Sequence, residues 1–107
     1  MARIMFASQK LKDDYEKLRR SQEHADLFRF ISRALDDISR DHRCGTQVQQ
    51  NLIPREYIKK YGIDNLWKYD LPGGWRLMYS AGGDRIEVMA IILEWLDHKS
   101  YERRFGY

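Results

Sequence analysis

Cysteine and long apolar runs are scarce in this chain of 107 residues. Cys44 is the single cysteine, so no disulfide can form within the chain, and a zinc site of the usual cysteine-rich type is excluded. Such cysteine usage fits a reducing compartment. No apolar run reaches the roughly 18 residues that a membrane span needs, and no secretory signal is visible. We therefore expect a cytoplasmic protein that does not associate with membranes.

The charge balance is also modest. The net charge of +3 favours polyanions only weakly, and it does not separate an RNA-binding protein from an ordinary one. Hydrophobic residues make up 43% of the chain, close to the globular norm, which argues against wholesale disorder. The length suits one domain spanning residues 1–107.

The first forty residues predict a strand over residues 2–7 and two helices. Ser8 is a suitable cap for a first helix that runs to about Arg20, and a second helix is expected over residues 21–40. Apolar residues at helical spacing support both. They are Leu11, Tyr15 and Leu18 in the first helix, and Leu27, Ile31, Ala34, Leu35 and Ile38 in the second. We expect these helices to form a hairpin packed on one side of a sheet.

The remaining residues predict one short helix and three strands. The helix begins at Pro54 and stops at Gly62. Alternating residues and Gly-rich turns mark the strands and their connections. The strands cover residues 66–71, 75–80 and 85–96, with turns at 72–74 and 81–84 and a tail at 97–107. The main order is strand, helix, helix, strand, strand, strand. It predicts an α+β fold with a small, mostly antiparallel sheet, one face under the helical hairpin and the other partly open.

Two strings in the last forty residues resemble the RelE/ParE toxin superfamily. Residues 66–80, LWKYDLPGGWRLMYS, are similar to the middle hairpin of that family, in which a Lys-bearing strand leads into a Gly-aromatic-Arg-Leu-x-Tyr strand. Residues 92–107, ILEWLDHKSYERRFGY, are similar to its C-terminal strand and tail. The order of predicted elements, β-α-α-β-β-β, also resembles the family's.

This resemblance implies a function and partners. Many members of the superfamily cut messenger RNA without a metal ion or cofactor, often at the ribosome, and are held inactive by a cognate antitoxin. Others inhibit DNA gyrase and do not cut RNA. A non-catalytic RNA- or protein-binding module of the same fold is a third alternative. The ribonuclease is the function that we expect.

RNA cleavage without a metal ion needs a base for the 2′-hydroxyl proton, a cation for the phosphate and an acid for the 5′-oxygen. Arg76 is the first candidate and matches the family position at the phosphate; otherwise it is a sheet arginine paired with a carboxylate. It should lie opposite Trp75 and Leu77 with an exposed guanidinium. His98 is the candidate acid or base, and otherwise a solvated loop histidine.

Tyr101 and Lys68 complete the expected catalytic set. Tyr101 is suited to stack on a base or orient the phosphate, or else to dock the tail on the core. Lys68 matches a family position where lysine often helps catalysis. Asp70 stands where some ribonuclease members carry a second lysine, and it is either a base or a turn cap. A ribonuclease site requires Arg76, His98 and Tyr101 to converge in one cleft on the open face of the sheet.

The other conspicuous residues carry weaker hypotheses. Lys99, Arg103 and Arg104 are candidate RNA-binding residues, or else belong to a solvated tail. We expect an ordered tail whose aromatic residues pack on the sheet, namely Tyr101, Phe105 and Tyr107. Structural or incidental roles are expected for His24, His42 and Cys44, core positions for Trp67, Trp75 and Trp95, and a solvated face for Arg55, Lys59 and Lys60.

Overall fold

The computed structural model describes residues 1–84 and 86–106, and in this part of the chain it contains four α-helices and a five-stranded sheet. The α+β class is therefore confirmed. The strands are β1 (Ala2–Phe6), β2 (Thr46–Gln47), β3 (Trp67–Asp70), β4 (Arg76–Gly83) and β5 (Val88–Leu96). The helices are α1 (Gln9–Arg20), α2 (Ala25–Arg40), α3 (Arg55–Tyr61) and α4 (His98–Phe105), with short 3₁₀ turns at Gln50–Leu52 and Pro72–Gly74.

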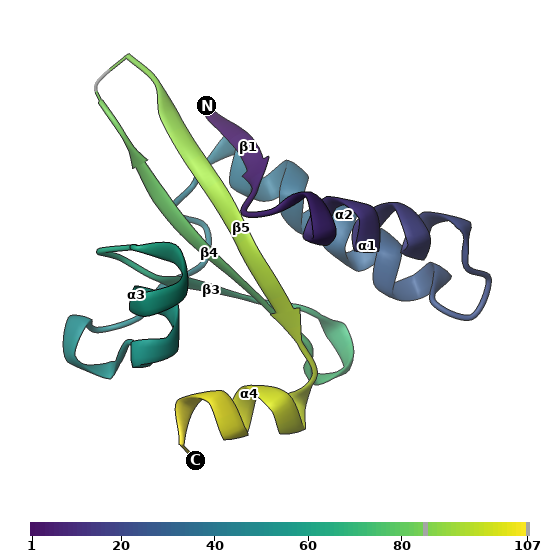
Figure 1. Ribbon diagram of the computed structural model, residues 1–107. Coiled ribbons are helices and arrows are strands. Elements are labelled where there is room, and N and C mark those ends of the chain that lie inside the picture. Colours follow the sequence, from purple (N-terminus) through teal and green to yellow (C-terminus); the bar gives the residue numbers. More distant parts are fainter. Residues whose placement is uncertain (85, 107) are drawn as a thin grey trace.

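The sheet has the strand order β1-β5-β4-β3-β2 (Figure 1). β5 lies between β1, to which it is parallel, and β4, to which it is antiparallel. β3 pairs with β4, and β2 pairs with β3, both in the antiparallel direction. The two-residue strand β2 was missed by the sequence analysis, because so short a segment has no periodicity to detect.

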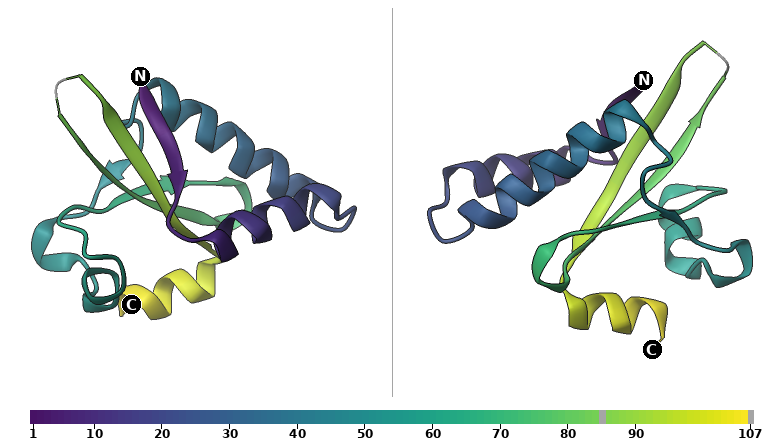
Figure 2. Two further views of the ribbon diagram at one scale, coloured as in Figure 1. Left: turned by 45° about the horizontal axis from the view of Figure 1, so that its top comes forward. Right: turned by 180° about the vertical axis from the view of Figure 1, so that it is seen from behind.

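The helical hairpin of α1 and α2 covers one face of the sheet, as expected (Figure 2). The side chains of Ile31, Ala34 and Ile38 on α2 are fully buried against it. Ser8 caps α1 as predicted, since its Oγ accepts a hydrogen bond from the Leu11 amide at 3.1 Å. The predicted start of the second helix at Ser21 is wrong. Residues 21–24 form a turn in which Ser21 Oγ accepts from the backbone amide of His24.

The opposite face is covered at the end that carries the predicted site. There α3 and α4 pack on the sheet, and their buried side chains include Tyr57 and Tyr101. The helix expected at Pro54–Gly62 is confirmed, and Gly62 ends it with a left-handed backbone (φ 64°). The tail is ordered as α4, with Phe105 packed against Tyr101 and Tyr57. Tyr107, expected to dock with them, lies outside the described residues.

A β-bulge in β5 sets which residues face α4. Met78 of β4 lies opposite Glu94, whereas the next residue, Tyr79, lies opposite Ile92. Leu93 is therefore the extra residue, and both Leu93 and Glu94 face α3 and α4. The turn predicted at 81–84 is wrong, because β4 continues to Gly83 and the turn follows it. Asp84 Oδ1 accepts the amides of residues 86 and 87 there.

Candidate functional site

Three charged residues of β3 and β4 share one face of the sheet. In the β3–β4 register Asp70 lies opposite Arg76, and Lys68 lies opposite Met78. Because side chains alternate along a strand, Lys68 and Asp70 fall on the same face as Arg76 and Met78. Leu77 and Tyr79 belong to the core on the other face, as the sequence predicted. The hairpin thus places these charges beneath α4.

Asp70 joins the two cations. Its Oδ1 lies 2.9 Å from Arg76 Nε and 3.6 Å from Lys68 Nζ. Both cations also face the ring of Tyr101, with Arg76 Cζ at 5.3 Å and Lys68 Nζ at 5.6 Å from its centroid. These distances are within the range of cation–π attraction. The structure therefore brings Lys68, Arg76, Tyr101 and Asp70 together, and we call them the Tyr101 cluster.

Burial within this cluster differs from expectation. The side chain of Arg76 is only 19% exposed, so the prediction of an exposed guanidinium is wrong. The reason is that Tyr101 of α4 lies over the guanidinium. In addition, Arg76 Nη1 donates to the carbonyl of Trp75 at 3.1 Å. The Arg76 Nε contact with Asp70 is close, but its angle falls short of a hydrogen bond. Asp70 is 61% exposed and pairs with these cations instead of capping the turn.

His98 lies at the rim of the cluster. It is the first residue of α4, one turn before Tyr101, and its side chain is 61% exposed. Its Nε2 lies 2.7 Å from Glu102 Oε1. Gly74, two residues before Arg76, approaches so closely that a Cβ there would lie 3.2 Å from the Cβ of His98. His98 is therefore next to the β3–β4 turn, but its side chain pairs with Glu102. Because Tyr101 is buried and Arg76 is largely covered, the three residues do not line one open cleft, as the ribonuclease hypothesis required.

The cap of α4 fixes the position of His98. Asp97 Oδ1 accepts the backbone amide of Ser100 at 2.8 Å, which is the usual capping interaction at a helix start. This hydrogen bond lowers the pKa of Asp97 below its ordinary value. The capping carboxylate thus stays charged at neutral pH, where it favours the helix dipole.

Arg104 is a structural link, so the expectation that it belongs to a solvated tail is wrong, whereas its RNA-binding role stays a prediction. Its Nη1 pairs with Glu94 of β5, its Nε lies 3.0 Å from Glu56 Oε2 of α3, and its side chain is 28% exposed. Its Cζ also lies 5.4 Å from the Tyr57 ring centroid. Burial alone would lower the pKa of Arg104, but Glu94 and the other neighbours raise it. Arg104 therefore stays positively charged where α4 contacts α3 and β5.

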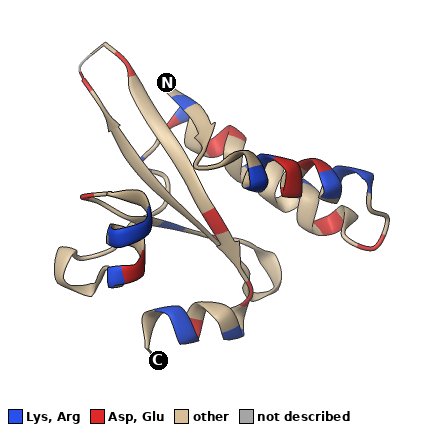
Figure 3. Cartoon of the chain, in the orientation of Figure 1, with Lys and Arg blue, Asp and Glu red and all other residues tan. Residues whose placement is uncertain are grey.

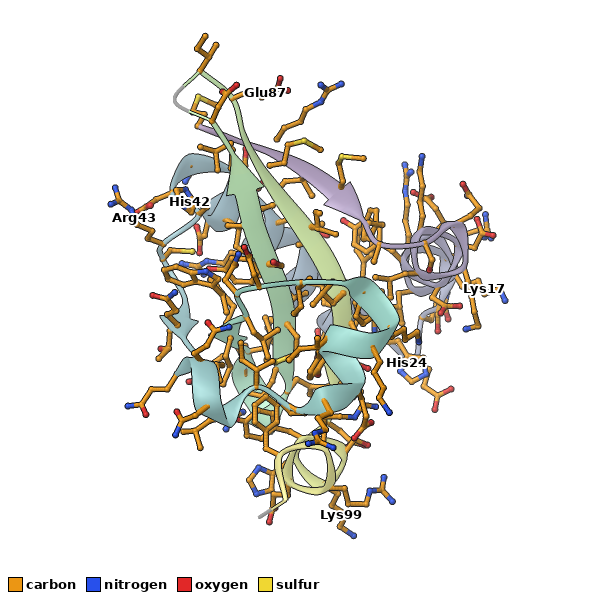
Figure 4. All side chains as sticks on the ribbon, turned by 60° about the vertical axis from the view of Figure 1, so that its left-hand side comes forward. Lys17, His24, His42, Arg43, Glu87 and Lys99 are labelled. Atoms are coloured by element: carbon orange, nitrogen blue, oxygen red, sulfur yellow. The ribbon has the colours of Figure 1, made fainter. Side chains whose placement is uncertain are left out.

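Lys99 and Arg103 are the exposed cations of α4. Lys99 projects away from the sheet (Figure 4), and Arg103 Nη2 donates to Ser100 Oγ at 3.2 Å. Basic segments also lie on α3, on the same side of the sheet as α4 (Figure 3). Exposed residues there include Arg55, Lys59 and Lys60, which form the solvated face predicted for them.

Tyr57 is a buried residue that sequence reasoning did not single out. Its side chain is fully buried, and its hydroxyl has no well-formed hydrogen bond to any described residue. Burial and the neighbouring Glu94 carboxylate raise its pKa, so the phenol stays neutral. Glu102, beside His98, was missed as well. Its spacing of four residues from His98 is a recognisable helical pair, but only once the tail is known to be helical.

The remaining histidines and Cys44 lie elsewhere. His24 lines a groove with Pro72, Gly73 and Trp75, and His42 lies on the segment that follows α2. The carbonyl of His42 accepts the Tyr79 hydroxyl at 2.7 Å. Cys44 lines a groove of about 460 Å³ that also contains Lys68 and Asp70, and burial is the main cause that raises its pKa. The three tryptophans, Trp67, Trp75 and Trp95, are partly buried against the core under α2.

Within residues 1–84 and 86–106, no group of three His, Cys, Asp or Glu side chains is arranged to hold a metal ion. The helices in this part of the chain are all too short or too polar to cross a membrane. Comparisons with protein-family models, curated proteins and solved structures found no match to this chain.

Proposed function

We propose that this chain is a metal-independent endoribonuclease that cuts messenger RNA as the toxin of a type II toxin–antitoxin system. The observation that carries the proposal is the Tyr101 cluster, in which Lys68 and Arg76 face one aromatic ring beside a groove. Two neighbouring cations suit a phosphate, since phosphates attract Arg and Lys. Tyr101 is buried, and its ring helps to position the two cations.

The proposed reaction is an internal transesterification, in which one proton leaves the 2′-hydroxyl and one joins the 5′-oxygen. The ribose 2′-oxygen attacks the adjacent phosphorus and loses its proton to a base. The bond from phosphorus to the 5′-oxygen breaks, and an acid protonates that oxygen, leaving a 2′,3′-cyclic phosphate and a 5′-hydroxyl. Arg76 and Lys68 stabilise the charge that develops on the phosphate. His98 at the rim supplies one of the two proton transfers, with its imidazole positioned by Glu102.

The fold adds support of a general kind. A helical hairpin after the first strand, a β3–β4–β5 meander and a C-terminal helix over the sheet agree with a RelE-like arrangement. Under this proposal the protein acts in the cytoplasm, its substrate is messenger RNA, most readily at the ribosome, and a cognate antitoxin covers the cluster. The exposed Lys99 and Arg103 on α4 provide further contacts to RNA phosphates.

Induced expression followed by sequencing of RNA 5′ ends tests the function. The wild-type chain should arrest growth and create new, discrete 5′ ends in messenger RNA. Arg76→Gln should lose this effect, because removing a positioned donor at a phosphate costs about 10²–10³ in rate. Arg3→Gln is the matched control, since Arg3 pairs with Glu87 and is 70% exposed. It should cut like wild type.

Two outcomes would contradict the proposal. Intact transcripts in cells that hold soluble, folded protein would rule out the ribonuclease function. Gyrase-linked DNA breaks in the same cells would favour a gyrase inhibitor. Because Arg76 is largely covered, the Arg76→Gln variant must be checked by thermal melting. Arg76→Lys, which keeps the charge, gives a second comparison if Arg76→Gln unfolds.

A further inference from the structure

Asp70 places a negative charge where a phosphate would have to bind. Its Oδ1 lies 2.9 Å from Arg76 Nε and 3.6 Å from Lys68 Nζ. It is also the most exposed of these three charges, with a side-chain exposed fraction of 61% against 19% for Arg76 and 24% for Lys68. A ligand that approaches from solvent therefore meets the carboxylate before it reaches either cation.

The carboxylate contributes little to holding the strands together. β3 and β4 are already joined by four register pairs of the ladder, and both cations also contact the ring of Tyr101. An ion pair with one exposed partner is worth less than a buried pair, although Asp70 also offsets the charge of the largely covered Arg76. The main consequence of Asp70 is thus electrostatic, because it lowers the attraction of the cluster for any anion.

We propose that Asp70 makes the Tyr101 cluster selective for ribose over deoxyribose by accepting a hydrogen bond from the 2′-hydroxyl next to the bound phosphate. The inference rests on the proposed function and names a specificity-determining residue for it. A phosphate held by Arg76 and Lys68 lies beside the Asp70 carboxylate, and the two anions repel each other. A donor hydroxyl next to that phosphate turns the repulsive neighbour into an acceptor.

Only RNA carries such a donor at every linkage. DNA presents the same phosphate to Asp70 without a hydroxyl, so it meets the repulsion uncompensated. Selectivity of this kind comes from a repulsive element directed against the wrong ligand. A lysine at residue 70 would instead attract both polymers alike. Asp70 therefore weakens binding in general and discriminates between the two sugars.

Three fluorescent oligonucleotides of one sequence separate these effects. They are RNA, the same sequence with 2′-fluoro groups, which cannot donate, and DNA. Every protein carries His98→Gln, so that RNA is not cut while affinity is measured by anisotropy. The parent should bind RNA about tenfold more tightly than 2′-fluoro RNA, the value of one hydrogen bond to a charged group. DNA should bind as weakly as 2′-fluoro RNA, or more weakly.

Replacement of Asp70 should alter selectivity in a specific direction. Asp70→Ala should bind 2′-fluoro RNA and DNA about three- to tenfold more tightly, since the repulsion is removed. Its affinity for RNA should change less, so the RNA preference falls toward one. Asp70→Asn removes the charge but keeps an acceptor, and it should retain part of the preference. Asp26→Asn is the matched control, because Asp26 is an exposed partner of Arg29 on α2. It should leave the three affinities as in the parent.

The inference is overturned if Asp70→Ala weakens binding of the three ligands equally, if it leaves the ratio of RNA to 2′-fluoro affinity unchanged, or if the parent shows no preference or no binding. Cleavage by the chain with His98 intact is scored separately. Asp70-dependent selectivity without any cleavage would support this inference and reject the ribonuclease function. Cleavage by the chain, with selectivity that Asp70→Ala leaves unchanged, would support the ribonuclease function and reject the role of Asp70.

Discussion

Arg104 Nε lies 3.0 Å from Glu56 Oε2, and the same guanidinium pairs with Glu94. One side chain near the end of the chain therefore ties α4 both to α3 and to the central strand β5. This link holds the helix that carries His98 and Tyr101 against the sheet.

Arg104→Ala should lower the free energy of unfolding by about 1.5–3 kcal/mol, because it leaves the largely covered Glu94 carboxylate without its charged partner. Urea unfolding monitored by far-UV circular dichroism measures the change. Arg103→Ala is the control on the same helix, and as an exposed substitution it should stay within about 0.5 kcal/mol of wild type. Equal losses in the two variants would show that Arg104 is not a structural link.

Gly74→Ala should destabilise the protein more than Gly62→Ala. Both glycines have positive φ, 83° and 64°, so an alanine costs roughly 1–2 kcal/mol at either position. A Cβ at Gly62 meets open space, whereas a Cβ at Gly74 lies 3.2 Å from the Cβ of His98. The expected loss at Gly74 thus rises to as much as about 3 kcal/mol. The urea midpoints of the two variants measure the difference. Identical midpoints would mean that the His98 side chain moves away from the new Cβ without a cost in stability.

Tyr69 should make stability fall in alkaline solution. Its hydroxyl donates to Asp37, and burial together with this hydrogen bond raises its pKa from 10.0 to about 12. Between these two values the unfolded chain has released the proton and the folded chain still holds it, so unfolding becomes more favourable as pH rises. Stability measured from pH 9 to 12 should decline less steeply in Tyr69→Phe. Parallel curves for the variant and wild type would contradict the assignment.

Cys44 should react slowly with thiol reagents at neutral pH. The residue is exposed, but nearby protein atoms that displace water, together with Asp37 and Asp41, raise the pKa of its thiol above the ordinary value, and the thiolate is the reactive form. The rate of reaction with a disulfide reagent should therefore be below that of a free cysteine peptide at pH 7 and should keep rising beyond pH 9. A rate equal to the peptide's at pH 7 would show that these surroundings have no effect on the thiol.

The sequence could predict the elements whose signal is local. The Ser8 cap, the apolar stripe of α2 and the Gly62 stop are each contained in a few consecutive residues. Strand alternation likewise placed Arg76 on the face opposite Leu77. The start of α2 was set too early because Ser21 bonds the His24 amide in a turn that resembles a helix cap.

The candidate site could be predicted only in part, because its contacts join distant segments. The resemblance to the RelE/ParE superfamily suggested Lys68, Arg76, His98 and Tyr101. The structure brings Lys68, Arg76 and Tyr101 together, but His98 pairs with Glu102. No local pattern indicates that Tyr101 covers Arg76, or that Arg104 pairs with a glutamate ten residues earlier and another on α3. Those contacts depend on how α4 packs on the sheet, which is a tertiary property.

The bulge at Leu93 reverses which residues of β5 face each side of the sheet. Upstream of it, even-numbered residues of β5 point to the α1–α2 side, and downstream of it they point to the other side. If β5 kept all of its residues but alternated strictly, without the bulge, Glu94 and Trp95 would exchange faces. The carboxylate would be forced into the tryptophan's apolar layer, and α4 would leave the strand on the wrong side of the molecule. Accommodation of the surplus residue as a bulge thus keeps the C-terminal helix on its surface of the sheet.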